Sequence, residues 1–205
     1  YISGWHQGRD KKFRIVGPKG TKEFFQNMLK AFKNELQGRV QWEQRPNKGG
    51  LDYEITEINS DYAYKNLHLE IIPFEVDHYP VEPAYGYQIK VSDTEMEKKV
   101  VISGDTRKNE NLINHAMDAD ALVHEVFINL EFDENRMSKK TISNVRDYHT
   151  SPKEIGEIAK AANVKKLILT HFVPPVFDED FLTKEIRESY KGNVIIGEDL
   201  LTIEI

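Results

Sequence analysis

Five titratable side chains border short apolar segments that are typical of buried strands. They are His78, Asp105, His124, His149 and His171. Side chains at the strand ends of an α/β sheet meet at one edge of the sheet, where such folds bind their ligands. One carboxylate and several imidazoles at one edge are the composition of a metal site. The pattern therefore predicts a metal centre built from residues that lie far apart in the sequence.

Each of these residues also has a simpler interpretation when it is taken alone. Asp105 follows Ser103-Gly104 and could close a turn or cap a helix. A single histidine at a strand end is more often a hydrogen-bonded core residue than a ligand. A shared site is favoured because the same position, at the border of a short apolar segment, recurs in all five residues. The remaining histidines do not occupy such a position. Those are His6, His68 and His115, which we interpret as structural or surface residues.

Composition narrows the choice of ligands and partners. The 205 residues include no cysteine, so a metal would have to be held by His, Asp or Glu. The net charge of −6 argues weakly against general binding of polyanions, although Arg39, Trp42, Arg45 and Lys48 form a local basic group. We interpret that group as a solvated loop. No apolar run approaches the roughly 20 residues of a membrane span, and no signal peptide is evident, so we expect a cytoplasmic protein without a membrane partner.

The elements that must position these side chains follow from periodicity. An apolar stripe at helical spacing predicts a helix from Thr21 that packs into the core. It comprises Phe24, Phe25, Met28, Leu29, Phe32 and Leu36. Ser151-Pro152-Lys153-Glu154 predicts a capped helix start, with Ser151 and Glu154 forming a capping box. Strands are predicted at 13–16, 51–58, 67–76, 85–91, 100–102, 121–123, 166–170, 194–196 and 201–205, and helices at 112–117 and 178–190. The polar segment 127–147 is either a lid or oligomer contact, or a mobile surface loop.

At this point several motifs together resemble a known family. They are Val76-Asp77-His78, Tyr85-Gly86-Tyr87, Ser103-Gly104-Asp105-Thr106, His124-Glu125, His149-Thr150-Ser151 and Leu169-Thr170-His171. Their order and spacing resemble the metallo-β-lactamase superfamily, within it the ribonuclease Z, arylsulfatase and cyclic-phosphodiesterase branch, from about residue 1 to 172. The resemblance implies an α/β protein, a four-layer αββα sandwich with two divalent metal ions at one edge. Zinc is the expected metal, with manganese or iron as alternatives.

The family's first metal-binding motif, His-x-His-x-Asp-His, has no match in this sequence. The opening strands of the family fold are also missing. We therefore expect residues 1–205 to form a single domain that is roughly the C-terminal three-quarters of the family domain. The metal site in this chain would be incomplete.

The resemblance also implies a role for each site residue. His78 corresponds to a ligand of the first metal, Asp105 to the bridging carboxylate and His171 to a ligand of the second metal. His149 corresponds to the catalytic histidine, Glu125 to its partner, and His124 to a neighbour with a supporting role. The implied reaction is hydrolysis of a phosphodiester or sulfate ester by a hydroxide that bridges the two metals, with His149 stabilising charge or protonating the leaving group.

The substrate is open between several alternatives. Ribonuclease Z carries a long insertion where this chain has only the short segment Gln88–Ile102, which favours a small-molecule ester. Processing of the tRNA 3′ end by a ribonuclease Z-like enzyme is the alternative, with tRNA as the partner. A third alternative is a non-catalytic or fragmentary family member that serves binding or assembly. We expect a homodimer.

Overall fold

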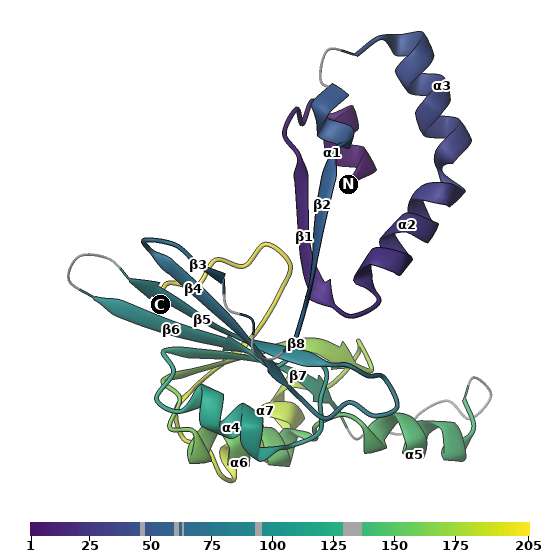
Figure 1. Ribbon diagram of the computed structural model, residues 1–205. Helices are drawn as coiled ribbons and strands as arrows, with labels where there is room; N and C mark the ends of the chain where they lie inside the picture. Colours follow the sequence, from purple (N-terminus) through teal and green to yellow (C-terminus); the bar gives the residue numbers. More distant parts are fainter. Residues whose placement is uncertain (46–47, 60–61, 63, 93–95, 129–136) are drawn as a thin grey trace. The chain divides into compact units, whose positions relative to one another are not determined.

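The computed structural model describes residues 1–205 except 46–47, 60–61, 63, 93–95 and 129–136. Within the described residues the chain forms two compact units, Tyr1–Asn59 and Ser60–Ile205. Each unit has its own sheet and helices (Figure 1). The expected α/β character is confirmed, and the prediction of a single domain stays a prediction.

The first unit is built on two parallel strands, β1 (Phe13–Pro18) and β2 (Tyr53–Ile58). Its helices are α1 (Ile2–His6), α2 (Thr21–Ala31) and α3 (Lys33–Glu43), with a short 3₁₀ helix at Lys48–Leu51. Aromatic rings pack edge to face between these elements, with the Phe25 and Tyr53 centroids 4.9 Å apart. The Arg9 guanidinium lies over the Phe13 ring, 4.6 Å from its centroid, so a cation–π contact joins the aromatic cluster.

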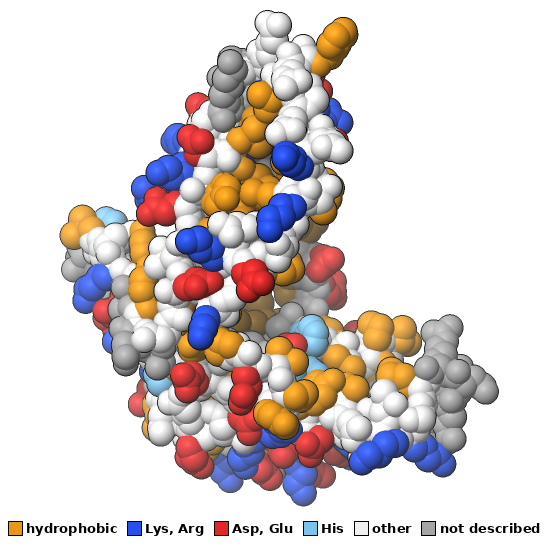
Figure 2. Space-filling view, turned by 45° about the vertical axis from the view of Figure 1, so that its right-hand side comes forward, with side chains coloured by type: hydrophobic (Ala, Val, Ile, Leu, Met, Phe, Trp, Pro, Cys, Tyr) orange, Lys and Arg blue, Asp and Glu red, His pale blue; other side chains and the backbone are white. Residues whose placement is uncertain are grey.

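The predicted packing of the apolar stripe in this unit is confirmed only in part. The helix is interrupted at Phe32, so two helices replace one. Phe25 is buried, but Phe24 is 71% and Phe32 46% exposed. Figure 2 shows hydrophobic side chains on the surface of this unit, in the upper part of the view. A helical period shows which residues share a face, and two strands offer too little surface to cover that face.

The second unit holds a seven-stranded sheet with the order β3-β4-β5-β6-β7-β8-β9. The strands are β3 (Tyr64–Lys65), β4 (Leu69–Glu75), β5 (Tyr85–Ser92), β6 (Glu97–Ile102), β7 (Ala121–Phe127), β8 (Lys166–Val173) and β9 (Asn193–Ile196). Pairing is antiparallel from β3 to β6 and parallel from β6 to β9. The parallel half contains the predicted apolar runs, which suits strands buried on both faces.

Helices α4 (Glu110–Ala116), α6 (Pro152–Ala161) and α7 (Glu179–Arg187) cover one face of this sheet (Figure 1). The core lies between them and the parallel strands, and includes Leu122, Ile155 and Leu182. Helix α5 (Lys139–Asp147), by contrast, contains no buried residue. It falls in the polar segment 127–147, of which residues 129–136 lie outside the described chain.

Two local predictions are wrong in this unit. Residues 201–205 form no strand, since the sheet ends at β9 and this segment does not pair with it. His68 lies just before β4 rather than within it. No helix in the described part of the chain has both the length and the apolar character needed to span a bilayer.

The predicted capping box at α6 is confirmed. The Ser151 hydroxyl accepts a hydrogen bond from the Glu154 backbone N–H, and the Glu154 carboxylate accepts one from the Ser151 N–H at 3.0 Å. Two N–H groups that the helix cannot satisfy are thereby paired. The cap fixes where α6 begins, and His149 lies two residues before the capping residue Ser151.

Alternation along β7 places Leu122, His124 and Val126 on the helix-covered face. The His124 side chain is fully buried, with Nδ1 2.6 Å from the Glu125 carbonyl oxygen. Its Nε2 has no hydrogen-bond partner among the described residues. Burial lowers the pKa of His124, and this effect outweighs the opposing influence of Glu125. The ring is therefore held in its neutral form.

We predict that Ser151→Ala lowers the free energy of unfolding by about 1 kcal/mol, because the α6 N–H groups lose their partner while the helix stays tied to the core. Ser138→Ala is the matched control, since Ser138 caps α5 in the same way and α5 buries nothing. Urea unfolding measures both. Equal losses of unfolding free energy in the two variants would contradict the expectation that a cap matters more on a helix that packs into the core.

The neutral state of His124 predicts a pH dependence. Because folding lowers its pKa, the folded protein binds fewer protons than the unfolded chain below the ordinary histidine pKa of about 6.5. Stability should be complete above that pH and fall as the pH drops. In His124→Gln the slope below pH 6.5 should be shallower, by up to about 1.4 kcal/mol per pH unit. Urea unfolding between neutral and acidic pH tests this, with the exposed His68→Gln as control. An unchanged slope in His124→Gln would refute it.

Candidate metal centre

Asp105 is carried past the edge of the sheet by a tight turn. Strand β6 ends at Ile102, and the Ser103 N–H still donates to the Val123 carbonyl at 2.9 Å. Gly104 then adopts a φ of 64°, and a Cβ at this position would lie 2.7 Å from the Tyr85 carbonyl oxygen. Only glycine fits this conformation without displacing β5. The turn leaves the Asp105 carboxylate partly exposed at the end of the strand.

His171 reaches the same edge through a β-bulge. Strand β8 pairs Thr170 with Glu125 and Phe172 with Val126, so His171 stands between two pairs with no partner on β7. Its φ of 47° is left-handed, a conformation in which histidine is enriched among non-glycine residues. A bulge of this kind redirects a side chain. Here it places the His171 Nδ1 3.4 Å from Asp105 Oδ1.

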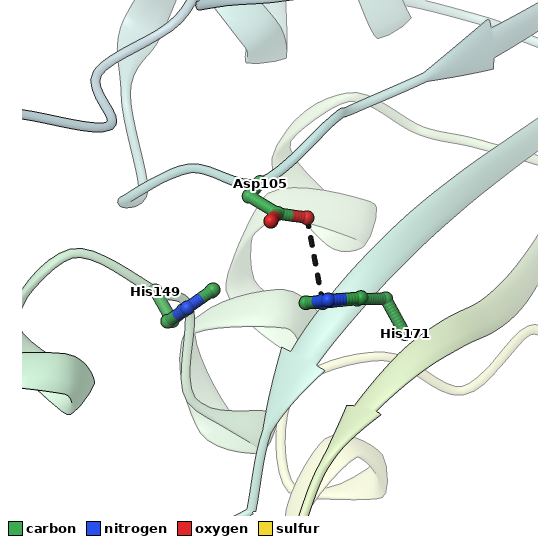
Figure 3. Close-up of side chains that lie close together, drawn as sticks. All are labelled: Asp105, His149 and His171. Atoms are coloured by element: carbon green, nitrogen blue, oxygen red, sulfur yellow. Dashed lines mark ion pairs between the residues drawn. The ribbon is translucent and has the colours of Figure 1, made fainter. Parts of the chain in front are cut away.

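His149 approaches from the segment between α5 and α6. It is buried, and Figure 3 shows it pointing toward Asp105 and His171. One potential ligand atom from each of the three residues lies within 4.8 Å of the others. The cluster thus includes His149, for which the resemblance implies a catalytic role, alongside two expected metal ligands.

His78 completes the surroundings of Asp105 from the other side. Its Nε2 lies 4.0 Å from Asp105 Oδ2, whereas His171 faces Oδ1. The His78 Nδ1 is 2.9 Å from the Tyr148 carbonyl, which accepts a hydrogen bond from that nitrogen in the tautomer that leaves the Nε2 lone pair free. The two oxygens of one carboxylate therefore face two different histidines, an arrangement suited to a bridging ligand.

Glu125 lies beneath His149 and is almost fully buried. Its Oε1 accepts hydrogen bonds from the N–H groups of Thr150 at 2.9 Å and Thr106 at 3.4 Å. Its Oε2 lies 3.2 Å from His149 Nδ1, an ion-pair distance without the alignment of a hydrogen bond. The carboxylate can offset a positive charge on the His149 ring.

The structure thus brings together five of the six predicted site residues. His124 differs, because alternation on β7 directs it into the core while its neighbour Glu125 faces the site. A supporting role for His124 stays a prediction and would have to act through the β7 backbone.

The donor set suits a borderline divalent cation. Carboxylate oxygen and imidazole nitrogen are both common zinc ligands. Asp105 and His171 are partly accessible to solvent, and one ligand atom from each of Asp105, His149 and His171 lies within 4.8 Å of the others. These residues therefore fit one part of a divalent-metal site.

A cavity of about 750 Å³ opens beside His149, between the end of α5 and the start of α6. Arg107 and Lys108 from the segment after Asp105 contribute to its wall. Arg107 was not predicted as a site residue, although it follows the Ser-Gly-Asp-Thr motif directly. Nor were Thr106 and Thr150, whose backbone groups hold Glu125 and which adjoin Asp105 and His149 in the sequence.

Comparisons with known proteins identify relatives of this chain. Ribonuclease Z from Mycobacterium bovis (strain BCG / Pasteur 1173P2) is 30% identical over 194 residues, which cover 93% of this chain and 66% of that protein. Ribonuclease Z from Mycolicibacterium gilvum (strain PYR-GCK) is 31% identical over 193 residues, covering 93% of this chain and 65% of that protein. The chain thus spans slightly less than two thirds of the length of these relatives.

Two solved structures show the same fold at lower sequence identity. The metallo-beta-lactamase fold protein YhfI from Bacillus subtilis is 20% identical with a TM-score of 0.62, over 96% of this chain and 65% of that one. The short form of human tRNase Z is 18% identical with a TM-score of 0.57, over 95% of this chain and 68% of that one.

The family described as beta-lactamase superfamily domain matches residues 5–172, close to the span of the resemblance seen in the sequence. The predicted fold class is confirmed with it. With most of its length matched, this chain belongs to the metallo-β-lactamase superfamily.

Proposed function

We propose that this chain carries a large part of the active site of a metal-dependent hydrolase that cleaves phosphodiesters. The observation that supports this most directly is the Asp105 carboxylate with His78 and His171 on its two oxygens. The buried Glu125–His149 pair next to that carboxylate supplies a candidate acid for the leaving group.

In this proposal His78, Asp105 and His171 hold two divalent cations, with zinc as the first candidate. Such cations supply a hydroxide nucleophile at neutral pH and neutralise charge on the ester oxygens. The three side chains leave ligand positions to be filled, and the resemblance expects those ligands in the His-x-His-x-Asp-His motif that this sequence does not contain.

His149 is proposed to act on the ester itself. Because Nδ1 lies against Glu125, the group free to face a substrate is the Nε2–H. A protonated ring could donate from Nε2 to a non-bridging oxygen or to the leaving oxygen, and Glu125 stabilises that charge. Glu125 is itself fixed by the Thr106 and Thr150 N–H groups, so the ring has a firm support.

Two substrates are supported by different observations. The relatives at 30–31% identity are named ribonuclease Z, which supports RNA and the tRNA 3′ end. Strands β5 and β6 pair as far as Ser92 and Glu97, which leaves little chain for a substrate-binding arm between them. That hairpin supports a small phosphodiester or an aryl sulfate. Homodimer formation and a cytoplasmic location stay predictions.

The proposed roles predict that two variants separate metal binding from catalysis. Asp105→Asn should lose bound zinc and activity together, because it removes the carboxylate between the histidines. Glu125→Gln should keep its zinc and lose at least about 100-fold in kcat, because His149 loses its charged partner. Elemental analysis and steady-state kinetics on the full-length protein measure both. Asp118→Asn, an exposed residue hydrogen-bonded to Asn163, is the control and should change neither.

Side-by-side assays with zinc-loaded full-length protein should identify the substrate. The substrates are bis(p-nitrophenyl) phosphate, p-nitrophenyl sulfate and a precursor tRNA. Phosphodiesterase activity that Asp105→Asn abolishes is the expected result. Cleavage of precursor tRNA at its 3′ end without small-ester turnover would assign the ribonuclease Z function. No turnover of any substrate by protein that binds zinc would refute the hydrolase proposal and favour a binding role.

A further inference from the structure

The Arg107 side chain links three segments of the second unit. Its Nη1 donates to Asp77 Oδ1 at 2.7 Å and to the Tyr79 carbonyl at 3.2 Å. Its Nη2 donates to Asp147 Oδ2 at 2.9 Å. The backbone N–H of Arg107 also donates to the Asp77 carbonyl at 2.8 Å. One guanidinium thus joins the segment after β4, the segment after β6 and the end of α5.

Each residue in these contacts lies one or two positions in the sequence from a proposed site residue. Asp77 and Tyr79 are the two sequence neighbours of His78. Asp147 stands two residues before His149, and Arg107 itself stands two residues after Asp105. The guanidinium therefore connects the chain at three places where a site side chain emerges.

The segments that carry His78, Asp105 and His149 lack the strand pairing that holds His171 in place. His171 is held by strand pairing on both sides of its bulge. His78, Asp105 and His149 instead lie on connections outside the strands and helices, which are generally the more mobile parts of a fold. A metal or catalytic site requires its groups to be held within about 0.5 Å. The hydrogen bond from the Thr106 hydroxyl to the Asp77 carbonyl, at 3.3 Å, is a weaker link along the same path.

We propose that Arg107 is a positioning residue, whose guanidinium fixes the mutual spacing of His78, Asp105 and His149 and thereby sets the affinity of the site for divalent cations. The part that concerns cations rests on the proposed function, whereas the fixed spacing does not. A guanidinium suits the task because its planar fork donates in several fixed directions. A lysine ammonium is a single point and could not reach the three acceptors equally.

The contribution of these contacts to global stability should be small. The Asp77 and Asp147 side chains are 52% and 76% exposed, and ion pairs with exposed partners add little to the free energy of unfolding. The effect of removing Arg107 should instead concentrate on the site. Outer partners that orient metal ligands typically change metal affinity 10–100-fold.

The test compares Arg107→Gln, Arg107→Lys and the control Lys108→Gln in the full-length protein. Lys108 is the adjacent residue and forms a similar ion pair, 2.6 Å from Glu157 of α6. Zinc affinity is measured by competition with a chelator. Imidazole Cε1–H resonances are recorded by NMR on the metal-free protein, and the melting temperature of each metal-free variant monitors folding.

We expect Arg107→Gln to bind zinc about 10-fold more weakly or worse, with Arg107→Lys intermediate and Lys108→Gln unchanged. In the metal-free Arg107→Gln protein the His78 and His149 resonances should shift or broaden. The resonance of His115, which stacks on Phe74, should not move. The melting temperature should stay close to that of the wild type. If Arg107→Gln does not fold, the same measurements on Arg107→Lys test the proposal.

Three results would overturn the proposal. One is wild-type zinc affinity with unshifted His78 and His149 resonances in Arg107→Gln. The second is an equal loss of affinity in Lys108→Gln. The third is a loss of affinity that follows an equivalent loss of folding. If the wild-type protein binds no zinc at all, the proposed function fails, while the resonances of the metal-free variants still decide whether Arg107 fixes the spacing.

Discussion

Parallel pairing of β6, β7 and β8 is the constraint on which the site depends. Ile102 pairs with Val123, and Glu125 pairs with Thr170, so three strands end at one edge of the sheet. Asp105 comes after the end of β6, whereas Glu125 and His171 lie near the C-terminal ends of β7 and β8. The residues that complete the site come from connections anchored nearby. The buried core between these strands and α4, α6 and α7 holds the three strand ends in place. A hydrophobic interaction on one face of the sheet thus sustains the polar chemistry at its edge.

Those parts of the structure that obey local rules could be predicted from the sequence. The capping box at Ser151 needs only residues three positions apart, and the apolar runs that end at Ile102 and Leu169 are visible without any tertiary information. The convergence of Asp105 and His171 also followed, because parallel strands end at a common edge. Local patterns therefore predicted where the site lies.

Other features depend on tertiary structure that no local pattern encodes. Periodicity in the apolar stripe could not reveal that Phe25 would be buried while Phe24 and Phe32 stay exposed. Arg107 gave no signal, because the sequence does not show that the segments carrying His78 and His149 come within reach of its guanidinium. The strand predicted at 201–205 also depended on tertiary structure, since its apolar residues do not show whether the segment pairs with β9. The burial of the His124 side chain in the core was not predicted either, although alternation on β7 separates it from its neighbour Glu125.

The bulge at His171 means that the site is encoded in the length of the chain as well as in the identity of its residues. Thr170 and Phe172 pair with successive residues of β7, so His171 is one residue more than the ladder needs. Deleting a single residue of β8 before this point would absorb the bulge and bring His171 into the ladder opposite Glu125, while Phe172 kept its partner Val126. Residues of β8 can therefore be substituted during evolution, whereas an insertion or deletion there would move this histidine away from Asp105.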